Sequence, residues 1–188
     1  MLQRDELAHT FVGGCVYQAY LSALSYHRWN APVSGTVVKV VKMPGTYYLE
    51  NINTGFEAEF VPDKATFTTG EPDSVGPNDS QKFLTAVATR MAIYINATNP
   101  DIGLMCFMAV GMAEVSSCEA VVKEGDYIKK GEPIGMFHYG GSTHVLIFNK
   151  EAADKLTFYT ELPDGFYNTF PNIDATNVPV LAQIAKCD

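Results

Sequence analysis

The sequence predicts an α+β domain that is mainly β, built from short strands with a few helices. The first observation is that runs of β-branched and aromatic residues, as in 33–48, are short and interrupted by glycine and proline. The second is that glycines recur in polar turns at 123–126 and 129–132, where they suit a positive φ. The third is that the 188 residues are 47% hydrophobic and 18% charged, enough for one buried core. We therefore expect a single domain over 1–188.

The first half of the chain predicts mixed elements around a long loop. Residues 1–25 fit either a short helix or a pair of strands broken at Gly13-Gly14, and both options stay open. Residues 33–48 predict short strands joined by turns. The polar segment 50–80, rich in glycine, proline, threonine and aspartate, predicts a long loop that could act as a flap.

Strands dominate the second half. Apolar residues at helical spacing predict a helix that runs into a strand over 82–96. The runs 104–110 and 118–122 predict buried strands. Beyond residue 150, prolines and polar residues precede a last apolar run, so we expect this tail to wrap the domain and add a final strand.

The segment 121–135 is similar to the paired hairpins of biotinyl and lipoyl carrier domains, and 31–37 is similar to their opening strand. A carrier needs a lysine at a hairpin tip, and none stands at the expected place, so we do not expect carrier function. The similarity implies a flattened barrel or sandwich.

Composition excludes several functions. A net charge of −8 repels nucleic acid and anionic membrane surfaces. The longest apolar run, 102–113, is shorter than the roughly 20 residues that span a bilayer, and the first residues carry mixed charges unlike a secretory signal. The four cysteines form no C-x-x-C pair, so we expect reduced thiols and no metal site. We expect a cytoplasmic protein that acts on a small molecule.

Three sequence blocks carry the functional signal. Gly140-Gly141-Ser142 interrupts a strand-like run and, alone, would indicate a bulge or tight turn. Together with 26–35 (Tyr-His-Arg-Trp-Asn-Ala-Pro-Val-Ser-Gly) and 110–115 (Val-Gly-Met-Ala-Glu-Val), it resembles the phosphatidylserine decarboxylase family. The resemblance is strongest to the soluble fungal branch that decarboxylates aromatic amino acids. It implies a core over about 21–148 and a C-terminal wrap over 149–188.

The resemblance implies self-cleavage between Gly141 and Ser142. The serine hydroxyl would attack the preceding carbonyl, which an unsubstituted glycine leaves free to bend. The products would be two fragments and a pyruvoyl cofactor made from Ser142, whose ketone accepts the electrons released as carbon dioxide leaves.

The chain departs from the family pattern at the base. The family motif His-x-x-His-x-Pro has Asn30 in place of its second histidine, and asparagine cannot take a proton. His27 remains, and the resemblance implies that it faces the substrate. The N-terminal aspartate of the family is absent, and 94–99 lacks acidic residues that relatives carry. His144 is a candidate substitute base if the strand is regular, and otherwise a structural or pocket-lining residue.

Further candidates are pocket residues. Carboxylates could bind a cationic substrate or be merely solvated, and aromatic side chains could line a pocket or simply belong to the core. The acidic candidates are Glu114 and Glu119, and the aromatic ones are Trp29, Phe107, Phe137 and Tyr139.

Three functions remain open from the sequence. The leading expectation, favoured by Asn30, is a repurposed, uncleaved enzyme without cofactor, a cyclase or isomerase acting on a small hydrophobic metabolite of secondary metabolism. The alternative is a decarboxylase of an amino acid or phosphatidylserine, with pyruvoyl formed at Gly141-Ser142. The third is a non-catalytic binding module, completed by a partner chain or by a second copy in a homodimer that covers open strand edges.

Overall fold

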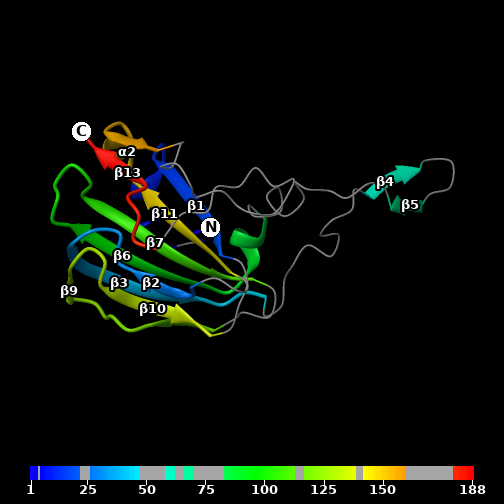
Figure 1. Cartoon of the computed structure of the whole chain (residues 1–188), viewed down its shortest axis with the longest axis horizontal. Helices are drawn as coiled ribbons and strands as arrows, with labels where there is room; N and C mark the ends of the chain where they lie inside the picture. Colours follow the sequence, from blue (N-terminus) through cyan, green and yellow to red (C-terminus); the bar gives the residue numbers. More distant parts are fainter. Residues whose placement is uncertain are drawn as a thin grey trace.

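Two facing β-sheets form the body of the protein in a computed structural model (Figure 1). The structure describes residues 1–3, 5–21, 26–46, 58–61, 66–69, 83–112, 117–138, 142–159 and 180–188. The predicted mainly-β α+β class is confirmed. The two sheets are separate in the described part of the chain, so the architecture is a sandwich rather than a closed barrel.

The larger sheet has six antiparallel strands in the order β1-β11-β7-β6-β3-β9. Its strands are β1 (Cys15–Leu21), β3 (Gly35–Met43), β6 (Arg90–Ala97), β7 (Leu104–Gly111), β9 (Tyr127–Ile128) and β11 (Ser142–Phe148). Strand β11 pairs with β1 on one side and β7 on the other without a register shift. Strict alternation of side chains between the two faces therefore holds along its length.

The smaller sheet has three strands in the order β2-β10-β8. They are β2 (Arg28–Asn30), β8 (Cys118–Ala120) and β10 (Pro133–Phe137). The turns around this sheet contain Gly125 (φ +89°) and Gly131 (φ +87°), which confirms the predicted positive φ at both glycines.

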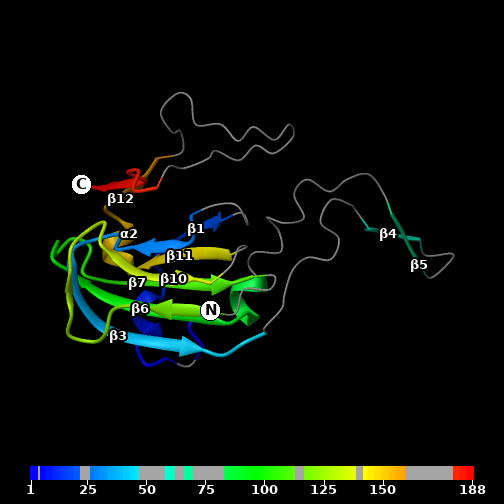
Figure 2. The same ribbon diagram turned by 60° about the horizontal axis from the view of Figure 1, so that its bottom comes forward.

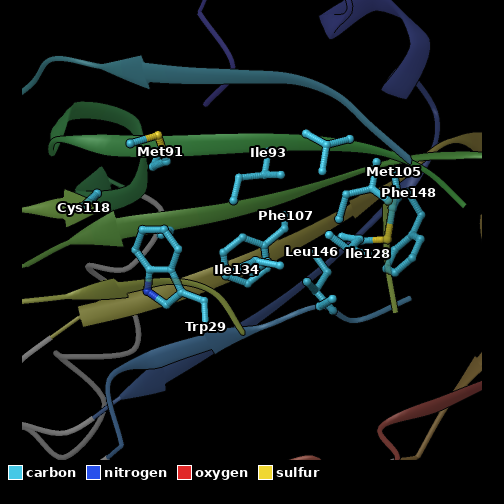
Figure 3. Close-up of a cluster of buried hydrophobic side chains, with 14 of the residues drawn as sticks. Trp29, Met91, Ile93, Met105, Phe107, Cys118, Ile128, Ile134, Leu146 and Phe148 are labelled. Atoms are coloured by element: carbon cyan, nitrogen blue, oxygen red, sulfur yellow. The ribbon is translucent and has the colours of Figure 1, made fainter. Parts of the chain in front are cut away.

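The main core lies between the two sheets. Trp29 and Ile134 from the small sheet belong to the same buried cluster as Phe107 and Leu146 from the large one (Figure 3). Phe137 of the small sheet is also a member of this cluster. A second core covers the other face of the large sheet, where the N-terminal segment with its 3-10 helix η1 (Ala8–Phe11) packs. Its members include Leu2, Phe11, Tyr94, Met108 and Val145.

The remaining elements are short. The hairpin of β4 (Ala58–Val61) and β5 (Thr66–Thr69) falls within the expected long loop, whose other residues lie outside the described part. Helix α2 (Lys150–Ala153) is capped by the Asn149 side chain, which accepts a hydrogen bond from the Ala152 amide at 2.8 Å.

The C-terminal strand β13 (Ala185–Cys187) pairs with β12 (Leu156–Phe158), at the α2 end of the large sheet (Figure 2). A last strand is therefore confirmed.

The helical segments can be compared with three predictions from the sequence. In the described part of 1–25, the short helix η1 precedes Gly13-Gly14 and the single strand β1 follows them, so the helix is confirmed and the pair of strands broken at these glycines is not observed there. The helix running into a strand is confirmed, with helical residues 83–87 followed by β6. None of the helices in the described part has the length and apolar content needed to span a bilayer.

Candidate active site

Ser142 begins strand β11 and lies between Leu21 of β1 and Gly111 of β7. Its side chain is fully buried, and its Oγ has no hydrogen-bond partner among the described residues. Unsatisfied buried hydroxyl groups are uncommon in native proteins, because losing water without a replacement partner is costly. A buried hydroxyl of this kind is suited to act as a reacting group or to bind a ligand.

His144 lies on the same face of β11 as Ser142, because the strand is regular. Two residues along a strand correspond to about 7 Å. The His144 ring stacks on Phe107, with centroids 6.1 Å apart and planes at 13°, and is 6.2 Å from the Tyr17 ring. Burial lowers its pKa to about 4, so the imidazole is neutral at neutral pH and has one unprotonated ring nitrogen.

A continuous row of rings connects His27 to His144 through the main core. The ring centroids are 6.2 Å apart for His27 and Phe137, 4.9 Å for Phe137 and Trp29, and 5.7 Å for Trp29 and Phe107. Phe107 then stacks on His144. The structure thus brings together five of the residues proposed from sequence, contributed by both sheets. We call these five side chains the ring row.

Trp29 combines an unpartnered polar atom with close packing. Its side chain is buried, yet the indole Nε1 has no hydrogen-bond partner among the described residues. The indole lies directly over Gly135, where a Cβ atom would be 2.2 Å from Trp29 Cε3. Glycine is therefore required at position 135 for this placement of the indole.

Asn30 faces away from the ring row. It follows Trp29 on β2, so its side chain points to the opposite face of that strand. Its Nδ2 donates a hydrogen bond to the Gly131 carbonyl at 3.0 Å, which ties β2 to the turn before β10. The hydrogen bond of Asn30 is therefore to the backbone of a turn and not to Ser142.

Glu119 does not join the ring row. Its carboxylate contacts the His138 ring at 2.5 Å, and both side chains are exposed. Three other candidates, Glu114, Tyr139 and Gly141, lie outside the described residues.

Sequence reasoning missed Tyr17. This half-buried side chain lies against His144 and stacks on Phe158, with centroids 5.5 Å apart and planes at 3°. Burial also raises the pKa of its hydroxyl. Alternation along 15–21 was the available signal, but it identifies a face only once the segment is known to be a strand.

The residues present fit a pyruvoyl group made from Ser142. The hydroxyl that would start the formation of that group is buried and unpartnered, and a neutral imidazole lies on the same face. The described residues contain no cluster of three or more potential metal ligands.

Comparisons with known proteins agree with this site. The family model for phosphatidylserine decarboxylase matches residues 1–161. Decarboxylase iboD of Amanita muscaria is 46% identical over 153 residues, which cover 81% of this chain and 42% of the relative. The L-tryptophan decarboxylase of Psilocybe cyanescens is 35% identical over 83% of this chain and 34% of its own length. A phosphatidylserine decarboxylase proenzyme of rice is 28% identical over 82% of this chain and 21% of its own length.

The chain therefore spans less than half the length of these relatives. The match nevertheless covers most of the chain, including the ring row and Ser142. The chain belongs to the phosphatidylserine decarboxylase family.

Proposed function

We propose that this chain is the core of a decarboxylase for a small amino acid with a hydrophobic or aromatic side chain, with Ser142 as the source of its electron sink. The observation that carries the proposal is the buried, unpartnered Ser142 Oγ on the same strand face as the neutral His144. The fungal relatives are named as decarboxylases, two of them from Psilocybe for L-tryptophan.

The first chemical task is processing of the Gly141-Ser142 bond. Ser142 Oγ would lose its proton as it bonds to the carbonyl carbon of Gly141, the peptide C–N bond would break, and the Ser142 nitrogen would take up a proton, which gives an ester. Elimination of the ester would leave the former Oγ in the carboxylate of Gly141 and a dehydroalanine at position 142. Hydrolysis of the dehydroalanine would release ammonia and leave a ketone whose oxygen comes from water. His144, which is neutral and two residues away on the same face, would take the proton of Ser142 Oγ through a bridging water, since that oxygen is not hydrogen bonded to the imidazole. Its low pKa makes it a weak base, so we expect slow processing.

The second task is to hold a substrate. A pyruvoyl group supplies a ketone that binds the substrate amine and accepts the electrons released with carbon dioxide. Phe107 stacks on His144 and packs against Trp29, so the surroundings of His144 are apolar and suit a hydrophobic substrate side chain. The unpartnered Trp29 Nε1 can donate a hydrogen bond to a polar substrate atom.

A second candidate function is supported by Asn30. Asparagine cannot act as the processing base, and here it is engaged with the Gly131 carbonyl. The chain would then remain uncleaved and use the ring row to hold a small hydrophobic metabolite in a reactive conformation, as a cyclase or isomerase without cofactor.

Mass measurement under denaturing conditions separates the two functions. The decarboxylase predicts two fragments, 1–141 and 142–188, the second with a carbonyl-reactive end, together with carbon dioxide release from L-tryptophan or another hydrophobic amino acid. Ser142→Ala removes the nucleophile and is the uncleaved control. His144→Gln should slow cleavage by about 100-fold or more if His144 is the base.

A single uncleaved species would refute the decarboxylase proposal for the isolated chain. In that case Asn30→His tests the cause: restored cleavage would show that the base at position 30 is what the chain lacks. Conversion of a hydrophobic metabolite by the uncleaved chain would establish the second function.

A further inference from the structure

Arg90, the first residue of β6, is a fully buried cation with an open hydrogen-bonding edge. Its relative exposure is 0%, and Nη1 donates to the Ala88 carbonyl at 2.5 Å. Nε and Nη2 have no hydrogen-bond partner among the described residues, and no described carboxylate forms an ion pair with Arg90. Burial lowers the pKa of the guanidinium, with no charge partner offsetting that effect.

The two unpartnered atoms define a specific geometry. Nε–H and the adjacent Nη2–H point in parallel from one side of the planar guanidinium, and this side binds both oxygens of a carboxylate. A buried guanidinium without a counter-charge is strongly unfavourable, because it loses hydration and gains nothing in return. A compensating anion is therefore expected at this edge.

Other buried polar groups lie on the same face of the sheet. Arg90 is opposite Val110, which is opposite Thr143, so the Arg90 and Thr143 side chains point to the same face from strands two positions apart. Thr143 is fully buried and donates to the Ala19 carbonyl at 2.9 Å. Gln18 Nε2 donates to the hydroxyls of Thr85 at 2.9 Å and Thr143 at 3.3 Å.

This polar layer is distinct from the candidate active site. Thr143 alternates with Ser142 and His144 on β11, so it points to the opposite face of the sheet. The core on this face includes the apolar Ala92, Met108 and Val145. The Asp5 carboxylate, which lies near Tyr94 on the same face, is paired with Lys39. The Nε/Nη2 edge of Arg90 therefore still has no described partner, which indicates a specific partner for the arginine.

We propose that the Nε/Nη2 edge of Arg90 is a carboxylate-binding site next to this hydroxyl-rich layer. The carboxylate has two sources to distinguish, a free small molecule or an Asp or Glu side chain of the protein itself. The inference stands on Arg90 and its surroundings and does not depend on cleavage at Ser142.

Thermal unfolding of the full chain with acetate as the probe tests the site. Acetate is titrated against chloride at matched ionic strength, for the wild type and Arg90→Met. Arg28→Met is the matched control, because it removes an arginine from the exposed position of β2. For a free-ligand site, we expect Tm to rise by about 3 °C at an acetate concentration ten times Kd. Arg90→Met should lose this rise and Arg28→Met should keep it.

The other outcomes are equally decisive. If acetate has no specific effect and Arg90→Met lowers Tm by 5 °C or more, the arginine is paired with a carboxylate of the protein, which supports the site with the second source. If acetate has no specific effect and Arg90→Met is as stable as the wild type or more stable, no carboxylate is bound and the proposal is wrong. An acetate effect that persists in Arg90→Met would also overturn it.

Discussion

Substitution of Gly135 by alanine should displace Trp29 and weaken the main core. The added Cβ atom would lie 2.2 and 2.4 Å from two carbons of the indole and 2.5 Å from the Glu119 carbonyl oxygen. Since non-bonded carbon atoms prefer about 3.5–4.0 Å, the ring must move by more than about 1 Å. It cannot move freely, because Phe107 and Phe137 contact it, with centroids at 5.7 and 4.9 Å.

The expected loss of stability is about 3 kcal/mol, at the upper end for overpacking, because the Cβ atom meets both a ring and a backbone oxygen. With a urea m-value of about 2 kcal/mol/M, the unfolding midpoint should fall by about 1.5 M. Trp29 is the sole tryptophan of the chain, so its fluorescence reports on this site directly. We expect red-shifted native emission, since the displaced indole becomes more exposed.

Gly125→Ala is the control for adding a methyl group elsewhere. No atom lies within 4 Å of its added Cβ, so only the backbone conformation at φ +89° is penalised, by about 1–2 kcal/mol. Its tryptophan emission should match the wild type. A Gly135→Ala variant with unchanged emission and midpoint would refute the close packing of Trp29 on Gly135.

Two further predictions concern strand β11. The pKa of His144 is about 4 in the folded state, below its ordinary value of 6.5, so the unfolded chain binds the proton more readily. The free energy of unfolding should therefore be highest above about pH 6.5 and fall by up to about 3 kcal/mol towards pH 4. Urea midpoints measured across this range should lose most of that slope in His144→Phe, and an equal slope would assign it to other groups. Thr143→Val leaves the Ala19 carbonyl without its hydroxyl donor and removes one of the two hydroxyls to which the Gln18 amide donates. It should cost about 1–3 kcal/mol, whereas Thr143→Ser should retain most of the stability in the same assay.

Local patterns predicted the elements better than their arrangement. The apolar run 104–110 became strand β7, and Gly125 and Gly131 adopt the positive φ expected of glycines in turns. The neighbours of β11 were not predictable, because β1 and β7 are paired with it by contacts between distant parts of the chain. Propensity describes a segment and not its partner.

The site was predicted in composition but not in geometry. Trp29, Phe137 and His144 were identified as candidates, yet their order in the ring row follows from the stacking of two sheets. The sequence did not indicate that Arg90 is buried, since a charged residue at the start of a strand ordinarily faces solvent. Arg90 lies on the face of β6 whose buried cluster includes Leu2 and Phe11 of the N-terminal segment and Ala88, whose carbonyl accepts its hydrogen bond.

The position of β11 inside the large sheet determines whether the two fragments would separate after cleavage of the Gly141-Ser142 bond. Each of its seven residues is paired with β1 on one side and with β7 on the other. The fragment 142–188 would therefore stay bound to 1–141 through two ladders of hydrogen bonds and through the buried side chains of Leu146 and Phe148. A nicked protein would elute and weigh as one particle under native conditions, and only a denaturant would release the two chains.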